Sequence, residues 1–181
     1  PPADEPAAVT IESALQLALA RHGEGEHATA ERIYRDILAQ HPGHADALHL
    51  LGLIHYQKGE PQTAIPYIEA AVAHTNSSFE NFHNSLGECL RAVGRVDEAV
   101  AHFDLALSLK PDFALASFNL GLSYQQLGAW DRAIELYRAV ADGGAGGVPG
   151  GADGGVVAEG GGGASGGASG GASGGASGGA S

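Results

Sequence analysis

Residues 119–138 read NLGLSYQQLGAWDRAIELYR and hold the pattern that decides the fold. Counting back from Leu120, a leucine recurs at Leu86, Leu51 and Leu17, at intervals of 34, 35 and 34 residues. A fixed period of this length indicates a repeat architecture. Four further columns share it: a small residue (Ala18, Gly52, Gly87, Gly121), a glycine (Gly25, Gly59, Gly94, Gly128), an alanine (Ala30, Ala64, Ala99, Ala133) and a large apolar residue (Tyr34, Ile68, Phe103, Tyr137).

Each repeat unit has the pattern of two helices joined by a turn. Apolar side chains recur at helical spacing before the turn glycine, as at Leu48 and Leu51 or at Leu120 and Tyr124, and again after it. The glycine ends the first helix because it adopts the left-handed backbone conformation without a steric cost. The one extra residue falls in the polar turn 75–78. The pattern predicts helices over 10–22, 26–40, 44–57, 61–74, 79–92, 96–109, 113–127 and 130–141.

The unit resembles the tetratricopeptide repeat (TPR), a helix–turn–helix with Leu-Gly, a later aromatic residue, Ala, a second aromatic residue and a closing proline. The fourth unit matches it from Asn119 to Tyr137, and the third closes at Pro111. The first departs from it with Arg21 at the aromatic position, and the second with Asn76 in place of the proline. The style is similar to that of bacterial TPR proteins and O-GlcNAc-transferase-like proteins.

This resemblance implies an all-α fold, a right-handed α-solenoid of about four antiparallel helical hairpins. We expect a TPR domain over 10–141, with repeats at 11–44, 45–79, 80–113 and 114–141. A Pro/Ala-rich extension at 1–9 precedes it. A Gly/Ala/Ser-rich tail at 142–181 follows, and we expect it to be disordered or a linker, because it offers almost nothing apolar to bury.

Composition excludes several classes of function. The formal net charge of −12 argues against nucleic acid as a partner, since phosphate binding relies on clustered Lys and Arg. One cysteine rules out an internal disulfide framework and a Cys-rich metal site. No apolar run reaches the roughly 18 residues of a membrane-spanning helix, so we expect no membrane insertion. We also expect no cofactor. A cytoplasmic location is the default, and an exported one stays open because the sequence opens with Pro1-Pro2.

Catalytic groups do not converge in this pattern, and we expect a protein that is not an enzyme. Most histidines fall at turns; His41 and His44 could share a metal, but Pro42 separates them and no third ligand is evident, so we expect none. Cys89 reads as a small buried apolar residue, and His55 replaces an aromatic residue in a core column.

In TPR proteins the first helix of each hairpin lines a concave face, which the resemblance carries to this chain. The middle of that face is polar and its last helix apolar. Phe118 could contact a partner there or simply pack against a neighbouring helix. Arg91 is the only cation on this face, so binding of an acidic chain terminus by paired basic residues is not expected. The candidate partner-binding residues are His49, Leu53, Tyr56, Asn81, Asn84, Glu88, Arg91, Leu115, Phe118, Leu122 and Gln125.

Three functions fit these observations. The leading hypothesis is a non-enzymatic scaffold that binds another protein or peptide in the groove or through its ends. The second is the TPR segment of a larger glycosyltransferase or sulfotransferase. The third is a self-assembling subunit, because the last hairpin has no evident cap. In that case Trp130, Ile134 and Tyr137 of one copy would dock on the first helix of another, at Ile11, Leu15 and Ala18, and form a ring or a filament.

Overall fold

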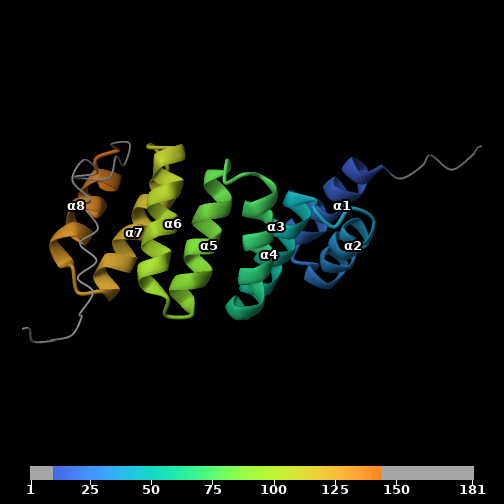
Figure 1. Ribbon diagram of the computed structural model, residues 1–181, viewed down its shortest axis with the longest axis horizontal. Coiled ribbons are helices and arrows are strands. Elements are labelled where there is room, and N and C mark those ends of the chain that lie inside the picture. Colours follow the sequence, from blue (N-terminus) through green and yellow to red (C-terminus); the bar gives the residue numbers. More distant parts are fainter. Residues whose placement is uncertain (1–9, 144–181) are drawn as a thin grey trace, which may run out of the picture. The chain divides into compact units, whose positions relative to one another are not determined.

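The structure is a computed structural model that describes residues 10–143, and in that range it contains eight α-helices and no strand (Figure 1). Every predicted helix is present, with both ends within one residue of the expected position. The extension at 1–9 and the tail from residue 144 lie outside the described residues. The helices are α1 (Ile11–Gly23), α2 (His27–Gln40), α3 (Ala45–Gln57), α4 (Pro61–His74), α5 (Glu80–Ala92), α6 (Val96–Leu109), α7 (Ala114–Gln126) and α8 (Trp130–Ala141).

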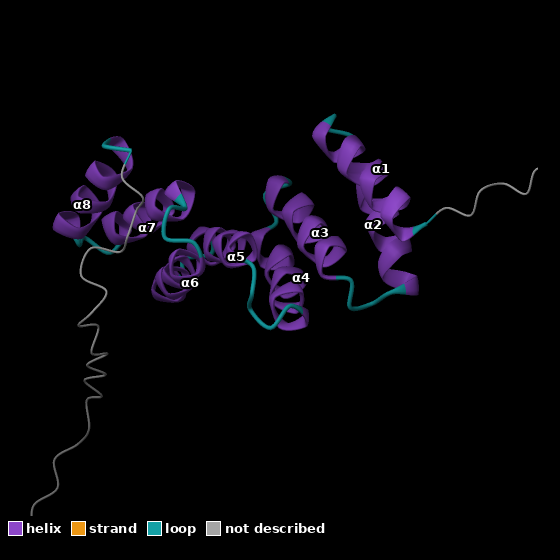
Figure 2. Ribbon diagram, turned by 90° about the horizontal axis from the view of Figure 1, so that it is seen from above, coloured by secondary structure: helices purple, strands orange, loops and turns teal. Residues whose placement is uncertain are grey.

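Consecutive helices pack against each other in four hairpins, α1–α2, α3–α4, α5–α6 and α7–α8. The hairpins are joined by the packing of α2 on α3, α4 on α5 and α6 on α7, so the helices follow one another in chain order in both ribbon views (Figures 1 and 2). The first helices also touch across hairpins, α3 with α5 and α5 with α7. The predicted α-solenoid of helical hairpins is therefore confirmed for the described residues.

The turns explain why the glycine column exists. Gly25, Gly59, Gly94 and Gly128 have φ angles of +79°, +77°, +82° and +76°, a left-handed conformation that side chains disfavour. The turn with the extra residue contains no glycine, and there Asn76 and Ser77 take positive φ instead, at +50° and +59°.

The small residue beside each column leucine marks the closest approach of two helices. A Cβ atom built on Gly87 would lie 2.7 Å from the ring of Phe103, and one on Gly52 would lie 2.5 Å from Ile68 Cγ1. Phe103 and Ile68 are fully buried. In the last three hairpins a large side chain of the second helix therefore packs directly on the backbone of a glycine in the first helix, and the first hairpin has the small Ala18 at that position.

Candidate partner-binding surface

A buried hydrogen-bond network links the first helices of the third and fourth hairpins. Asn119 Nδ2 donates to Asn84 Oδ1 at 3.1 Å, and Asn84 Nδ2 donates to Glu88 Oε2 at 3.1 Å. Both asparagines are 3% exposed. Because buried amides without partners are costly, the network fixes α5 and α7 relative to each other and holds the Glu88 carboxylate in place.

Charged and phenolic groups from α3 and α5 surround this carboxylate. Burial raises the pKa of Glu88, against the opposing effects of the Arg91 charge and of hydrogen bonds from Asn119 and Asn84. Burial, and then the charge of Glu88, raises the pKa of Tyr56. Arg91 is half-buried, and within residues 10–143 its Nε atom is buried without a hydrogen-bond partner. The guanidinium therefore keeps an unused donor beside a hydrogen-bonded carboxylate.

The predicted groove residues differ in how accessible they are. Asn81, Leu115 and Gln125 are exposed, whereas His49 and Asn84 are buried and cannot contact a partner directly. The half-buried members are Leu53, Tyr56, Glu88, Arg91 and Leu122. Residues that share a place in the repeat form two rows across the first helices. We call Tyr56, Arg91 and Gln125 the inner row; Leu53, Glu88 and Leu122 lie beside it, one helical turn earlier.

Phe118 belongs to a different surface from the one predicted. Its counterparts in the earlier repeats are covered by the following hairpin: His49 Nε2 lies 2.9 Å from Ser85 Oγ, and Asn84 accepts from Asn119. At the fourth hairpin the same position is 45% exposed, and the Phe118 ring packs on Tyr137 at 5.6 Å between centroids. It therefore lies on the face that a further hairpin would cover.

Some of the residues predicted for self-association are accessible, and others are buried. Trp130 and Ile134 are 58% and 42% exposed, and Tyr137 is half-buried, its hydroxyl donating to Gln125 Oε1 at 3.1 Å. Leu15 and Ala18 are buried in the core formed with α2 and α3, which removes them from any end surface. Ile11 is half-buried and stays available.

The other candidate groups have structural roles. His44 Nδ1 accepts from Ala47 N at the start of α3, and His55 Nδ1 lies 2.8 Å from Glu60 Oε2 while its ring stacks on Tyr67. Cys89 is fully buried, and burial raises the pKa of its thiol to about 12. Among residues 10–143 no group of three or more His, Cys, Asp or Glu is placed to hold a metal. No helix of this range is long and apolar enough to cross a bilayer.

Three buried or half-buried histidines, His49, His83 and His102, gather around α5, and the sequence pattern did not single out His83 or His102. One Nδ1 atom of the pair His83 and His102 donates to the other at 3.0 Å, with the rings stacked. Burial lowers the pKa of both, and it lowers the pKa of His49 to about 4. Repeat columns do not reveal such a pair, because the two side chains come from different columns of neighbouring helices.

These histidines predict a loss of stability in mild acid. Below about pH 6.5 these histidines bind protons in the unfolded chain more readily than in the folded chain, where burial lowers their pKa. The free energy of unfolding therefore falls as the pH drops, until about pH 4, where His49 becomes protonated in the folded state. For His49 alone the loss approaches about 3 kcal/mol, at 1.36 kcal/mol for each pKa unit. His49→Gln keeps a hydrogen-bonding side chain but cannot protonate, so urea unfolding should depend less on pH.

The matched control is the same change at His41, which is exposed. His41→Gln should leave the pH profile unchanged. An equal flattening in both variants would show that the buried histidine is not the source of the acid sensitivity.

Comparison with known sequences supports the repeat assignment. A family model described as tetratricopeptide repeat matches residues 15–81 and 84–148. The peroxisomal targeting signal receptor of Candida glabrata is 35% identical over 85 residues, which is 47% of this chain and 14% of the receptor. A tetratricopeptide repeat and J domain-containing co-chaperone of Fusarium oxysporum is 31% identical over 83 residues, 46% of this chain and 16% of that protein. The chain thus matches only a small part of these relatives.

Solved structures agree on the fold. A crystal structure of MamA superposes with a TM-score of 0.68 at 23% identity, over 76% of this chain and 80% of that one. MamA from Desulfovibrio magneticus RS-1 gives the same TM-score at 19% identity, over 75% and 76% of the two chains. At these identities the likeness concerns the arrangement of the hairpins alone.

Proposed function

The chain belongs to the tetratricopeptide repeat family, and from that premise we propose that it is a non-enzymatic scaffold that binds a partner protein or peptide across α3, α5 and α7. The family alone does not decide this, because repeat folds serve many roles. Support comes from two relatives that are named as receptors for a targeting signal. It comes more directly from the inner row.

The single observation that carries the proposal is Arg91, a half-buried cation that makes no side-chain hydrogen bond or ion pair with residues 10–143. Its Nε is buried, so a partner would reach the guanidinium through its Nη atoms. Tyr56 and Gln125 occupy the same row on the neighbouring first helices, and Leu53 and Leu122 lie beside them. A partner segment that crosses this row can offer a carboxylate or amide oxygen to Arg91 and place apolar side chains on the two leucines. The occupant is therefore a peptide with a hydrogen-bond acceptor between apolar residues.

Selection from a random peptide library, displayed against the full chain, tests this assignment. Selected peptides should carry an acidic or amide side chain with apolar neighbours. Arg91→Ala should weaken their binding about tenfold in calorimetric titration, since a hydrogen bond to a charged group contributes about 1.5–3 kcal/mol. Arg91 belongs to the inner row and is not a member of the apolar core clusters.

Arg32→Ala is the matched control, because Arg32 is an exposed arginine on α2, away from the inner row. It should bind the selected peptides like the unmodified chain. Peptides that bind equally to the Arg91→Ala variant, or a selection that yields none, would contradict binding at the inner row.

A further inference from the structure

The first helix lacks the cover that its counterparts have. The column leucine is 1% exposed at Leu51, 2% at Leu86 and 0% at Leu120, because the preceding hairpin packs on it. At Leu17 the same position is 48% exposed. Within residues 10–143 the start of the hairpin stack therefore presents a leucine that every later repeat buries.

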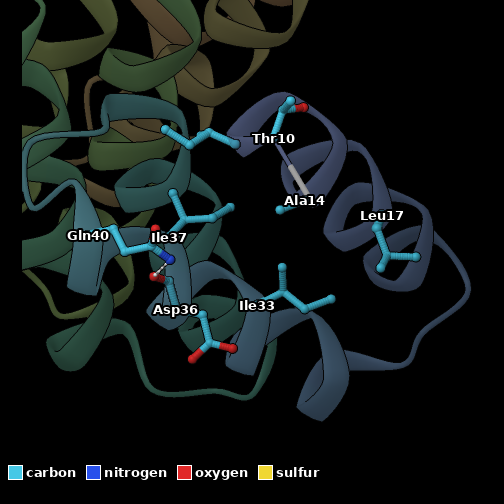
Figure 3. Close-up of a pocket in the computed structure, with 8 residues that line it drawn as sticks. Thr10, Ala14, Leu17, Ile33, Asp36, Ile37 and Gln40 are labelled. Carbon is cyan, nitrogen blue, oxygen red and sulfur yellow. Dashed lines mark hydrogen bonds between the residues drawn. The ribbon is translucent and has the colours of Figure 1, made fainter. Parts of the chain in front are cut away.

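An apolar groove surrounds Leu17. It lies between α1 and α2 with a volume of about 260 Å³, and Figure 3 shows Ala14 and Leu17 from one helix facing Ile33 and Ile37 from the other. Thr10, Asp36 and Gln40 line its polar edge. The position of Ala14 recurs as Leu48, His83 and Ser117, all of which are buried. We call Ile11, Ala14, Leu17 and Ile33 the start face; Ile37 is buried beneath it.

The last hairpin is uncovered in the complementary way. Trp130 is 58% exposed where its counterpart Val96 is 8% exposed, and Ile134 is 42% exposed where Ile65 is 7% exposed. Phe118 is exposed at a position that the next hairpin covers in all three earlier repeats. We call Phe118, Trp130, Ile134 and Tyr137 the end face. It is the kind of surface that a terminal repeat needs to have covered.

We propose that the end face of one copy binds the start face of a second copy, so that α1 of the second copy takes the place that a ninth helix would occupy. The chain itself shows that the two kinds of face fit, because α2–α3, α4–α5 and α6–α7 join them three times within one molecule. A second copy continues these joints in the same repeat register, with Leu17 in the position of Leu51, Leu86 and Leu120.

This contact is head-to-tail, and each copy uses a different face. Such contacts close into a ring or extend as a filament. The proposal goes beyond the scaffold function and does not depend on it, since the inner row takes no part in the joint. Of the three α1 residues predicted from the sequence for this contact, Ile11 remains part of it. Leu15 and Ala18 are buried, and Ala14 and Leu17 take their place.

Sedimentation velocity of the full chain over a range of concentrations tests the proposal with two charge substitutions. Leu17→Glu disables the start face and Ile134→Glu the end face, and both positions are exposed, so each variant should fold. The unmodified chain should associate with rising concentration, and each variant alone should stay monomeric. A mixture of the two should form a dimer and nothing larger, because only one intact pair of faces remains.

Leu105→Glu is the control, since Leu105 is 45% exposed on α6 in an internal hairpin. It should associate like the unmodified chain. An unmodified chain that stays monomeric at high micromolar concentration would overturn the proposal. So would association that either substitution leaves intact, or a mixture that stays monomeric, because the contact would then join two like faces or involve another occupant.

Discussion

Phe103→Ala is expected to lower the free energy of unfolding by about 4 kcal/mol. Phe103 is fully buried in the larger core cluster, and its ring packs on Gly87, where no side chain can move in to fill the space. The loss combines the removed apolar burial with the cavity left behind. Urea unfolding followed by circular dichroism measures it directly.

Phe79→Ala removes the same group of atoms from a site that is 49% exposed, and it should cost less than about 1 kcal/mol. A double-mutant cycle tests the contact itself. Gly87→Ala places a methyl group against the Phe103 ring and should destabilise the unmodified chain, yet it should cost less in a Phe103→Leu background, where there is room. Strictly additive costs would contradict the proposed contact between Gly87 and Phe103.

The fold could be predicted from the sequence because one period was repeated in five columns at once. The column leucine, the small residue and the turn glycine each have a physical requirement, so together they placed the helix ends to within one residue. The helices on either side of the extra turn residue, α4 and α5, were still predicted at the right positions, since the insertion fell between them in a polar turn.

The candidate surfaces were less predictable, because exposure depends on neighbouring hairpins. A helical-face pattern assigns Leu15, His49, Asn84 and Phe118 to one surface, yet the following hairpin buries all but the last. The column of leucines could have predicted which residue is exposed at the start of the hairpin stack. A residue that is buried in the middle repeats must be exposed in the first repeat if nothing precedes it, which would have selected Leu17 in place of Leu15.

Side-chain pairing within the polar region was also beyond the sequence pattern. The Asn84–Asn119 hydrogen bond joins neighbouring columns of two repeats, and the buried His83–His102 pair depends on how two helices of one hairpin are rotated. Columns give the position along a helix, but they do not give the direction in which a polar side chain leaves it.

Within residues 10–143 each hairpin covers the next and leaves one face open at either end of the stack. Thiol labelling measures this cover at single positions. In a Cys89→Ser background, which removes the chain's one cysteine, Leu17→Cys and Leu86→Cys place a thiol at the same column in the first and third repeats. Leu17 is 48% exposed and Leu86, which follows the α3–α4 hairpin, is 2% exposed.

At low protein concentration Leu17→Cys should react almost as fast as a free thiol. Leu86→Cys should react about a thousandfold more slowly, because labelling there requires a local opening of about 4 kcal/mol. Raising the protein concentration should slow the first reaction and leave the second unchanged, since a second copy then covers Leu17. Equal labelling rates at the two positions would contradict the account.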